Sequence, residues 1–404
     1  MRWYLDVIDG KFITPSSGAH AGADTIAYQK PYKAAGLDKT IPWYQTKGSH
    51  DNFWFGSDIV IDYLRQNYVG EDILRLGDVF IDRANGFNER TYYMGTVDGS
   101  TPYGNIIGAG SVKTTPAIKV VADPNRHSLD MKDWMSVFFE TSSNPVGHGF
   151  TQTNIDNDFA SYSFDPKSNI PIKVIMLDDT QSENGPNLHE YGNGSLDKAR
   201  YDWLISELDK GQSEGKLMII ATHVPIGVEP FRSGKNGSWG VSDVPAGADT
   251  YVTDTELITT LQQTYSNLIL WLAGHQHNNQ VTPFKSPDPN HPEYGFWEVQ
   301  TASLRDFPEQ FRTFEIVRNT DNTISIIITD VDPAVREGSP AAMSRFYAIA
   351  AKELYKTPSV PDTSTSVYNA ELIKQLSPEM QTKIQNYGTP IHKSLLQNSH
   401  PMQL

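Results

Sequence analysis

The sequence predicts an α/β fold with a largely parallel sheet and a second sheet beside it. Three apolar segments are short, unbroken and rich in Ile, Leu and Val, as expected of strands buried on both faces of a sheet; they cover residues 172–177, 216–221 and 268–273. Helical patterns separate these segments, at residues 195–208 and 254–265. Strands that are joined through helices in this way run parallel within one sheet.

The helix at residues 195–208 links two of the predicted strands. Apolar side chains recur at helical spacing from Leu196 to Leu208, and Ser195 is a suitable capping residue. Gly211 is expected to end the helix. We therefore predict a β-α-β unit that begins at residue 172.

Later strands have a different pattern. Residues 296–300 and 311–317 alternate between apolar and polar side chains, and residues 323–329 form another strand, so these segments are assigned to the second sheet. Earlier in the chain, a strand is expected at residues 41–46. Residues 56–150 are irregular and are interpreted as an insertion beside the core.

The carboxy-terminal part changes in character after residue 330. We predict one domain over residues 1–330, followed by a helical extension at residues 331–404. Its helices are expected at residues 341–355 and 370–385, on either side of a linker rich in Pro, Ser and Thr.

Composition limits the classes of partner. The 404 residues are 38% hydrophobic and 20% charged, as in ordinary soluble domains, and a formal net charge of -15 disfavours binding to nucleic acid or anionic lipid. No apolar run approaches the ~18 residues of a membrane helix. Because the chain has no cysteine, a metal would have to bind through His, carboxylate or amide oxygen, which favours Mn, Fe, Zn or Ca.

Histidines follow two of the buried strands directly. Gly274-His275-Gln276-His277 comes after residues 268–273, and His223 comes soon after residues 216–221. The carboxyl ends of parallel strands lie at one edge of a sheet, where ligands gather. In an extended chain, the rings of His275 and His277 would point to the same side. These histidines either bind a metal or are solvated loop residues.

Another apolar segment, earlier in the chain than the three predicted strands, leads into Gly48-Ser49-His50-Asp51. The repeated placement of a histidine after an apolar segment favours a metal site over chance. Asp178 and Asp179 also follow a predicted strand. These carboxylates either line the metal site, orient a metal-bound histidine or cap the next loop, and we favour the structural role.

In chain order and context, the three histidine segments resemble motifs of the calcineurin-like metallophosphoesterases. Gly48-Ser49-His50-Asp51 resembles the third motif, GNH(D/E), His223 the fourth, and Gly274-His275-Gln276-His277 the fifth, GHxH. The resemblance covers roughly residues 40–330. It implies a four-layer α/β/β/α sandwich of two mixed sheets.

Two features depart from the family pattern. The first two motifs, DxH and GDxx(D), do not occur before Gly48, so we predict a sandwich that lacks its first β-α-β segment, as in an amino-terminally truncated member. Any targeting signal would then lie in the missing segment, and the sequence indicates no compartment. Gly77-Asp78 is interpreted as a chance pair because it follows the third motif. Ser49 replaces an Asn that ligates metal in the family.

The resemblance implies hydrolysis of a phosphate monoester or diester by a metal-bound hydroxide at a dinuclear site. His223 and His275, together with Ser49, would ligate one divalent metal ion, Mn, Fe or Zn, and His277 would ligate the second. The substrate would be a small phosphorylated molecule.

The resemblance gives the third motif a catalytic part. His50 would protonate the leaving group or stabilise the phosphoryl oxygens, and Asp51 would hold its tautomer and raise its pKa. Because the missing motifs supply two carboxylates and a histidine in the family, activity is expected to be impaired in this chain. The alternative is a non-catalytic relative that keeps the fold for binding or structure, which the Ser49 replacement favours. A mononuclear histidine-site enzyme fits the strand and helix order less well.

Overall fold

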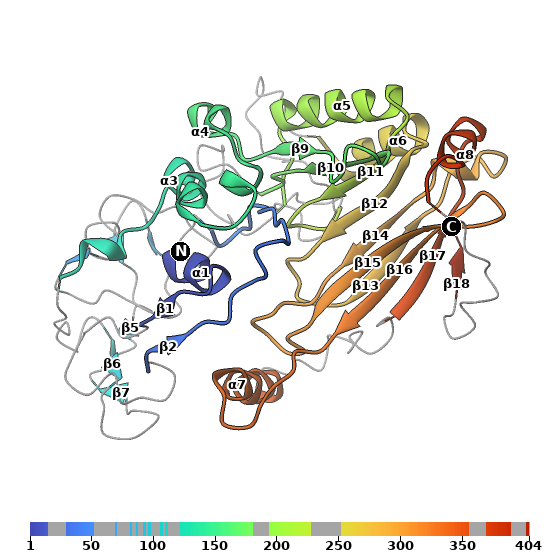
Figure 1. Ribbon diagram of the computed structural model, residues 1–404. Helices are drawn as coiled ribbons and strands as arrows, with labels where there is room; N and C mark the ends of the chain where they lie inside the picture. The colour runs from blue at the N-terminus through green and yellow to red at the C-terminus, as the bar shows by residue number, and fades with distance from the viewer. Residues whose placement is uncertain are drawn as a thin grey trace. The chain divides into compact units, whose positions relative to one another are not determined.

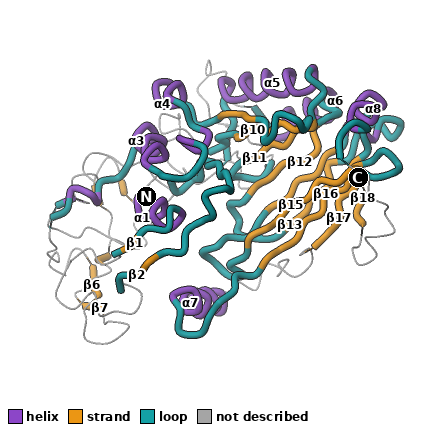
Figure 2. Tube along the Cα trace, viewed as in Figure 1, coloured by secondary structure: helices purple, strands orange, loops and turns teal. Residues whose placement is uncertain are grey.

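A computed structural model of the chain describes residues 1–14, 30–51, 69–70, 122–180, 194–227, 252–354, 369–388 and 401–403, together with two-residue strands between residues 81 and 111. The chain divides into two compact units (Figures 1 and 2). The first contains residues 1–44 and 59–148, and the second contains residues 45–58 and 149–404. The predicted Gly77-Asp78 pair, like most of residues 56–121, lies outside the described residues.

The second unit contains a six-stranded mixed sheet, and this confirms the predicted α/β class. Its central strands run parallel, while its two edge strands pair antiparallel with their neighbours. In spatial order the strands are β13 (Gln280–Phe284), β14 (Phe296–Gln300), β12 (Leu268–Ala273), β11 (Leu217–Ala221), β10 (Ile172–Met176) and β9 (Tyr162–Phe164).

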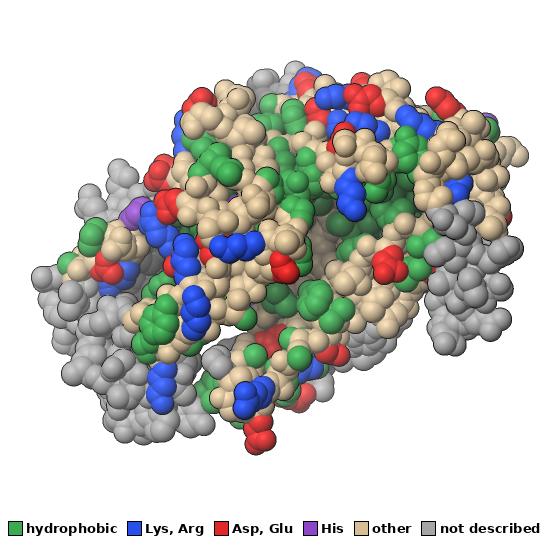
Figure 3. All heavy atoms as spheres, viewed as in Figure 1, with side chains coloured by type: hydrophobic (Ala, Val, Ile, Leu, Met, Phe, Trp, Pro, Cys, Tyr) green, Lys and Arg blue, Asp and Glu red, His purple; other side chains and the backbone are tan. Residues whose placement is uncertain are grey.

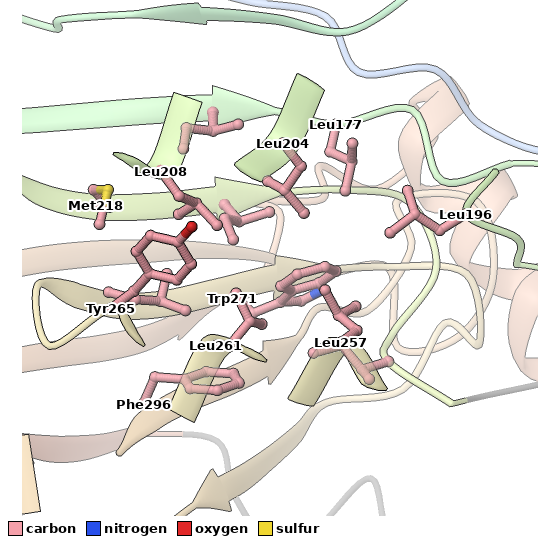
Figure 4. Packing of buried hydrophobic residues seen from close by; sticks show 14 of the residues in the cluster. Leu177, Leu196, Leu204, Leu208, Met218, Leu257, Leu261, Tyr265, Trp271 and Phe296 are labelled. Carbon is pink, nitrogen blue, oxygen red and sulfur yellow. The ribbon is translucent and has the colours of Figure 1, made fainter. Parts of the chain in front are cut away.

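Helices α5 (Lys198–Ser213) and α6 (Asp254–Thr264) pack on one face of this sheet. The predicted β-α-β unit is confirmed, since β10, α5 and β11 follow one another and the two strands are parallel. Figure 4 shows the core that results, in which Leu204, Leu261 and Trp271 are fully buried. This core holds the strands in the register that sets where each one ends.

Gly211 does not end α5 as predicted. It lies inside the helix, where a Cβ atom would come within 2.4 Å of Met218 Sδ. Glycine is therefore needed for the close approach of α5 to β11, and the helix continues because the tight packing on the sheet compensates for the poor helix propensity of glycine.

The second sheet contains β15 (Phe311–Arg318), β16 (Ile324–Val331), β17 (Asn369–Lys374) and β18 (Pro401–Gln403). The assignment of residues 296–300 to this sheet is wrong, because β14 pairs with β12 in the first sheet. The first three strands pair antiparallel, and β18 runs parallel to β17. Ile326 and Ile328 of β16 pack with Trp297 and Leu270 of the first sheet in a second apolar core. The two sheets of this unit therefore face each other.

The predicted helical extension after residue 330 is wrong in part. Helix α7 (Pro340–Leu354) forms as expected, but residues 369–374 form an inner strand of the second sheet, and residues 149–404 lie in one unit. A helix follows only at α8 (Pro378–Ile384), because Ser377 caps it and Pro378 begins it. Alternate side chains of β17, Ala370 and Leu372, enter the core, which favours a strand.

No strand forms at residues 41–46 as predicted. Trp43 in this segment instead stacks on His148, with the two ring centroids 3.4 Å apart.

The remaining described elements are short. The elements are α1 (Arg2–Ile8), α3 (Met131–Ser136), α4 (Gln152–Asn157), β1 (Phe12–Ile13), β2 (Tyr32–Lys33), β3 (Ile81–Asp82), β4 (Gly86–Phe87), β5 (Tyr92–Tyr93), β6 (Thr96–Val97), β7 (Ile106–Ile107), β8 (Gly110–Ser111) and 3-10 helices at Pro124–Arg126, Val137–Glu140 and Pro292–Tyr294.

On the face in view, Lys and Arg side chains are interspersed with Asp and Glu (Figure 3). Among the described residues, no helix has both the length and the apolar character needed to cross a membrane.

Truncation of a leucine in the helix–sheet core should destabilise the second unit strongly. Leu261 is fully buried, so Leu261→Ala removes apolar contacts and leaves a cavity, at a cost of about 2–5 kcal/mol in the free energy of unfolding. Leu304→Ala is the matched control because Leu304 is 66% exposed, and it should cost less than ~0.5 kcal/mol. Urea unfolding measures both, and equal losses would contradict the described core.

Lys374 should make stability depend on pH. It is fully buried, its Nζ donates to the carbonyl oxygens of Glu293 and Gly295, and burial lowers its pKa to about 7. In the unfolded chain this pKa is about 10.4. Between these values the unfolded chain binds more protons than the folded one, so the lysine's contribution to stability rises with pH, by at most ~1.4 kcal/mol per pH unit.

The measurement is the free energy of unfolding of the wild type and Lys374→Met at pH 7, 8 and 9. The value for the wild type minus that for the variant should increase with pH. A constant difference would mean that Lys374 is charged in the folded chain.

Candidate functional site

The candidate site lies where the central strands of the first sheet end. Parallel pairing brings the carboxyl ends of β10, β11, β12 and β14 to one edge. The segments that follow are joined by backbone hydrogen bonds: Gly274 N donates to His223 O at 3.0 Å, and Thr301 N donates to Ala273 O at 2.9 Å. The predicted meeting of His223 and His275 at this edge follows from the strand order.

His223, His275 and Ser49 converge there from separate parts of the chain. His275 Nδ1 lies 3.2 Å from His223 Nε2, and Ser49 Oγ lies 3.1 Å from the same nitrogen. Ser49 is fully buried. A Cβ atom on Gly48 would lie 3.4 Å from the His223 ring and 3.2 Å from Asp51 Oδ2, so glycine allows this loop to lie close to the imidazole.

His223 is held in its neutral form. Burial lowers its pKa to about 3, with further contributions from the positive charges that His275, His50, His277 and Lys47 carry when protonated. A neutral imidazole has a free nitrogen lone pair, which is the form that binds divalent metals.

The backbone at His275 and His277 differs from the prediction. The two residues are not extended: both adopt left-handed conformations, with φ of 70° at His275 and 58° at His277. The prediction that an extended chain would place both rings on one side is therefore wrong, because β12 ends at Ala273 and the chain turns. Left-handed backbone costs ~1–2 kcal/mol for a residue with a Cβ, and such strain clusters at functional sites.

His277 has a different partner from the other two residues. Its Nδ1 forms a short contact with Asp306 Oδ2, from the segment after β14. That segment is fastened to the histidine loop by Ala302 N, which donates to Asn279 Oδ1 at 2.9 Å. The side chains of His277 and Asp306 are 40% and 49% exposed, so their contact is open to solvent.

The relation predicted between His50 and Asp51 needs correction. Asp51 Oδ2 accepts a hydrogen bond from Gly48 N at 2.6 Å, so the carboxylate closes the loop on itself. The pKa of His50 is lowered, not raised, by desolvation, by the nearby guanidinium of Arg305 and by His275 and His277. Desolvation is the largest of these effects.

The sequence prediction did not include Lys47. It is buried, and its Nζ donates to Thr180 Oγ1 and lies 3.8 Å from Asp178 Oδ1. Arg200 approaches the same carboxylate at 3.6 Å. This cluster fastens the loop that carries Ser49 to the end of β10, and the only sequence signal was a lysine where an apolar segment turns polar.

The sequence prediction also gave too little weight to two further buried carboxylates. Asp179 is fully buried beside His223, and Glu298 is 3% exposed on β14. Burial raises the pKa of each to about 7. An acid at one of the two polar positions of the strand at 296–300 was the available signal for Glu298.

The donor atoms fit one divalent metal ion in part. Two nitrogens bound at ~2.0–2.1 Å to one tetrahedral metal lie roughly 3.4 Å apart, close to the observed separation of 3.2 Å between His223 Nε2 and His275 Nδ1. Ser49 Oγ is a third, weaker donor. Within the described part of the chain, no group of three or more His, Asp or Glu side chains is placed to hold a metal. The predicted second metal has His277 alone among the predicted ligands.

Comparisons with known proteins return no family. No protein-family model matches the chain, and no curated protein is significantly similar to it.

The strain at His275 can be measured by comparing two small substitutions. His275→Gly and His275→Ala both remove the imidazole, but only alanine keeps the Cβ that disfavours a φ of 70°. The glycine variant should therefore be more stable than the alanine variant by about 1 kcal/mol in urea unfolding. A more stable alanine variant would contradict the left-handed backbone. The same pair of changes at Gln276, which has no positive φ, should favour alanine.

Proposed function

We propose that this chain is a metal-dependent phosphoesterase of the metallophosphoesterase type, with its site at the carboxyl ends of β11 and β12. The observation that supports this most directly is the convergence of three separate segments on His223 Nε2. His275 Nδ1 lies 3.2 Å from this nitrogen, and Ser49 Oγ lies 3.1 Å from it. The two facing sheets and the helices on the first support the sandwich expected for such an enzyme.

In this proposal His223 and His275 bind one divalent cation, with Ser49 as a weak third donor. Such a cation, when bound, polarises a phosphoryl oxygen and lowers the pKa of water. The low pKa of His223 keeps its nitrogen available at neutral pH, so protons do not compete for the site. Among the predicted ligands, His277 belongs to a second, less complete position and is paired with Asp306.

The chain's own residues give the rest of the site an anion-binding character. Arg305 is exposed, and no ion pair joins it to another residue that the structure describes. Its backbone N donates to Ser303 Oγ at 2.9 Å, which folds the segment after β14 beside the histidines. We assign Arg305 and His50 to the phosphoryl oxygens of the substrate, where His50, kept neutral by its lowered pKa, donates an N–H hydrogen bond.

The proposal is tested by metal content and turnover together. Protein purified without chelator is assayed for bound metal and for hydrolysis of p-nitrophenyl phosphate with added Mn²⁺. His223→Ala and His275→Ala should each lower metal affinity and turnover by at least ~100-fold. His291→Ala is the control, because that histidine is 58% exposed and pairs with Glu293. Turnover that survives both substitutions would refute the proposal.

Arg305 should act on substrate binding. Arg305→Ala should raise the KM for p-nitrophenyl phosphate about 10-fold, because a charged hydrogen bond contributes ~1.5 kcal/mol or more, while Arg305→Lys should raise it less. Steady-state kinetics measure both variants. Arg336→Ala, at another exposed arginine, should leave KM unchanged. An unchanged KM in Arg305→Ala would exclude this contact.

A second candidate is a non-catalytic binding protein with the same fold. The His277–Asp306 pair and the weak hydroxyl ligand of Ser49 favour it, because both reduce the metal-binding capacity of the site. This candidate predicts that phosphate and Mn²⁺ bind, as measured by calorimetry, without turnover of the aryl phosphate.

A further inference from the structure

Two buried carboxylates enclose the turn that carries His223. Asp179 follows β10, Glu298 lies on β14, and the turn at residues 222–227 follows β11. Both side chains are almost completely removed from solvent, at 0% and 3% exposure. Burial of a carboxylate is costly, so a fold that keeps two at one turn has a use for them there.

Both carboxylates accept hydrogen bonds from the backbone of this turn. Asp179 Oδ1 lies 3.2 Å from His223 N, and its two oxygens lie 3.2 and 3.1 Å from Val224 N. Glu298 Oε2 accepts from Ile226 N at 2.8 Å. Three N–H groups at the end of β11 thus have carboxylate partners. Because the N–H group of His223 is one of the three, these bonds fix the backbone from which the imidazole extends.

The charges of these two groups are uncompensated, in contrast to that of their neighbour. Asp178 has Lys47 at 3.8 Å and Arg200 at 3.6 Å, and these cations lower its pKa. Neither Asp179 nor Glu298 forms an ion pair with a residue that the structure describes. Burial is the largest contribution to the raised pKa of each. Burial therefore disfavours the charged form of both carboxylates, and their visible role is to accept hydrogen bonds from the turn.

We propose that Asp179 and Glu298 are positioning residues that hold the His223 turn, through its backbone N–H groups, in the geometry in which His223 and His275 bind a divalent cation. The inference rests on the proposed function for its metal-binding part. It assigns both carboxylates to the backbone of the turn and not to direct ligation. Replacing either carboxylate by an amide, which leaves one acceptor oxygen in place of two, should therefore weaken metal binding without removing a ligand.

The test uses nearly isosteric substitutions in the full chain. Glu298→Gln and Asp179→Asn keep the shape of each side chain and remove its charge. The matched control is Glu371→Gln, because Glu371 is 4% exposed and accepts from Ser325 Oγ in the other sheet. Affinity for Zn²⁺ alone is measured by competition with a chromophoric chelator at pH 8, and thermal unfolding is recorded for each protein.

Zn²⁺ affinity should fall about 10–100-fold in Glu298→Gln and Asp179→Asn and less than about 2-fold in Glu371→Gln. Equal affinity in the wild type and both site variants would overturn the inference while leaving the proposed function intact. If Asp179→Asn does not fold, the comparison of Glu298→Gln with Glu371→Gln decides the question.

A second readout separates failure of the inference from failure of the proposed function. The imidazole nitrogen resonances of His223 are recorded in metal-free protein labelled with ¹⁵N-histidine. They should shift in Asp179→Asn and stay in place in Glu371→Gln. If the wild type does not bind Zn²⁺, the proposed function fails, and a shift still supports the positioning role. Unchanged resonances would overturn that role.

Discussion

The alignment of parallel strand ends is the constraint on which the rest of the site depends. Because β10, β11, β12 and β14 are neighbours in one sheet, every segment that follows them begins at the same edge. Backbone N–H and C=O groups just beyond the strand ends need new hydrogen-bond partners, and these come from the adjoining segments. His223 and His275 meet because their strands are hydrogen-bonded neighbours, and the helix–sheet core fixes that pairing.

Buried charge gives this edge its chemical character. Lys47, Asp178 and Arg200 form a balanced cluster that fixes the loop carrying Ser49. Among the described residues, the donors to Asp179, one residue further, are backbone N–H groups and a hydroxyl. Burial keeps His223 neutral. The left-handed backbone at His275 and His277 turns their rings out of the strand direction. Neutral imidazoles whose backbone is held by buried carboxylates make a site suited to a divalent cation.

Sequence patterns predicted the elements whose burial is uniform and missed those set by tertiary contacts. The segments at 268–273 and 254–265 were found because apolar periodicity reports burial directly. The interior position of Gly211 and the strand at β17 depend on neighbours distant in sequence, Met218 and β16. In the site, the residue types and their strand ends were predictable. The left-handed conformation of His275 was not predictable, since this residue is itself neither glycine nor asparagine. The partners of Lys47 and Glu298 become apparent only in the folded chain.

Anomalous diffraction from crystals soaked in Mn²⁺ would test the central claim most directly. The account predicts a metal peak in contact with His223 Nε2 and His275 Nδ1, with Ser49 Oγ beside it, and Asp179 retained on the backbone of the His223 turn. A metal bound elsewhere on the chain, or the two histidines hydrogen-bonded to each other with no metal between them in Mn²⁺-saturated crystals, would contradict it.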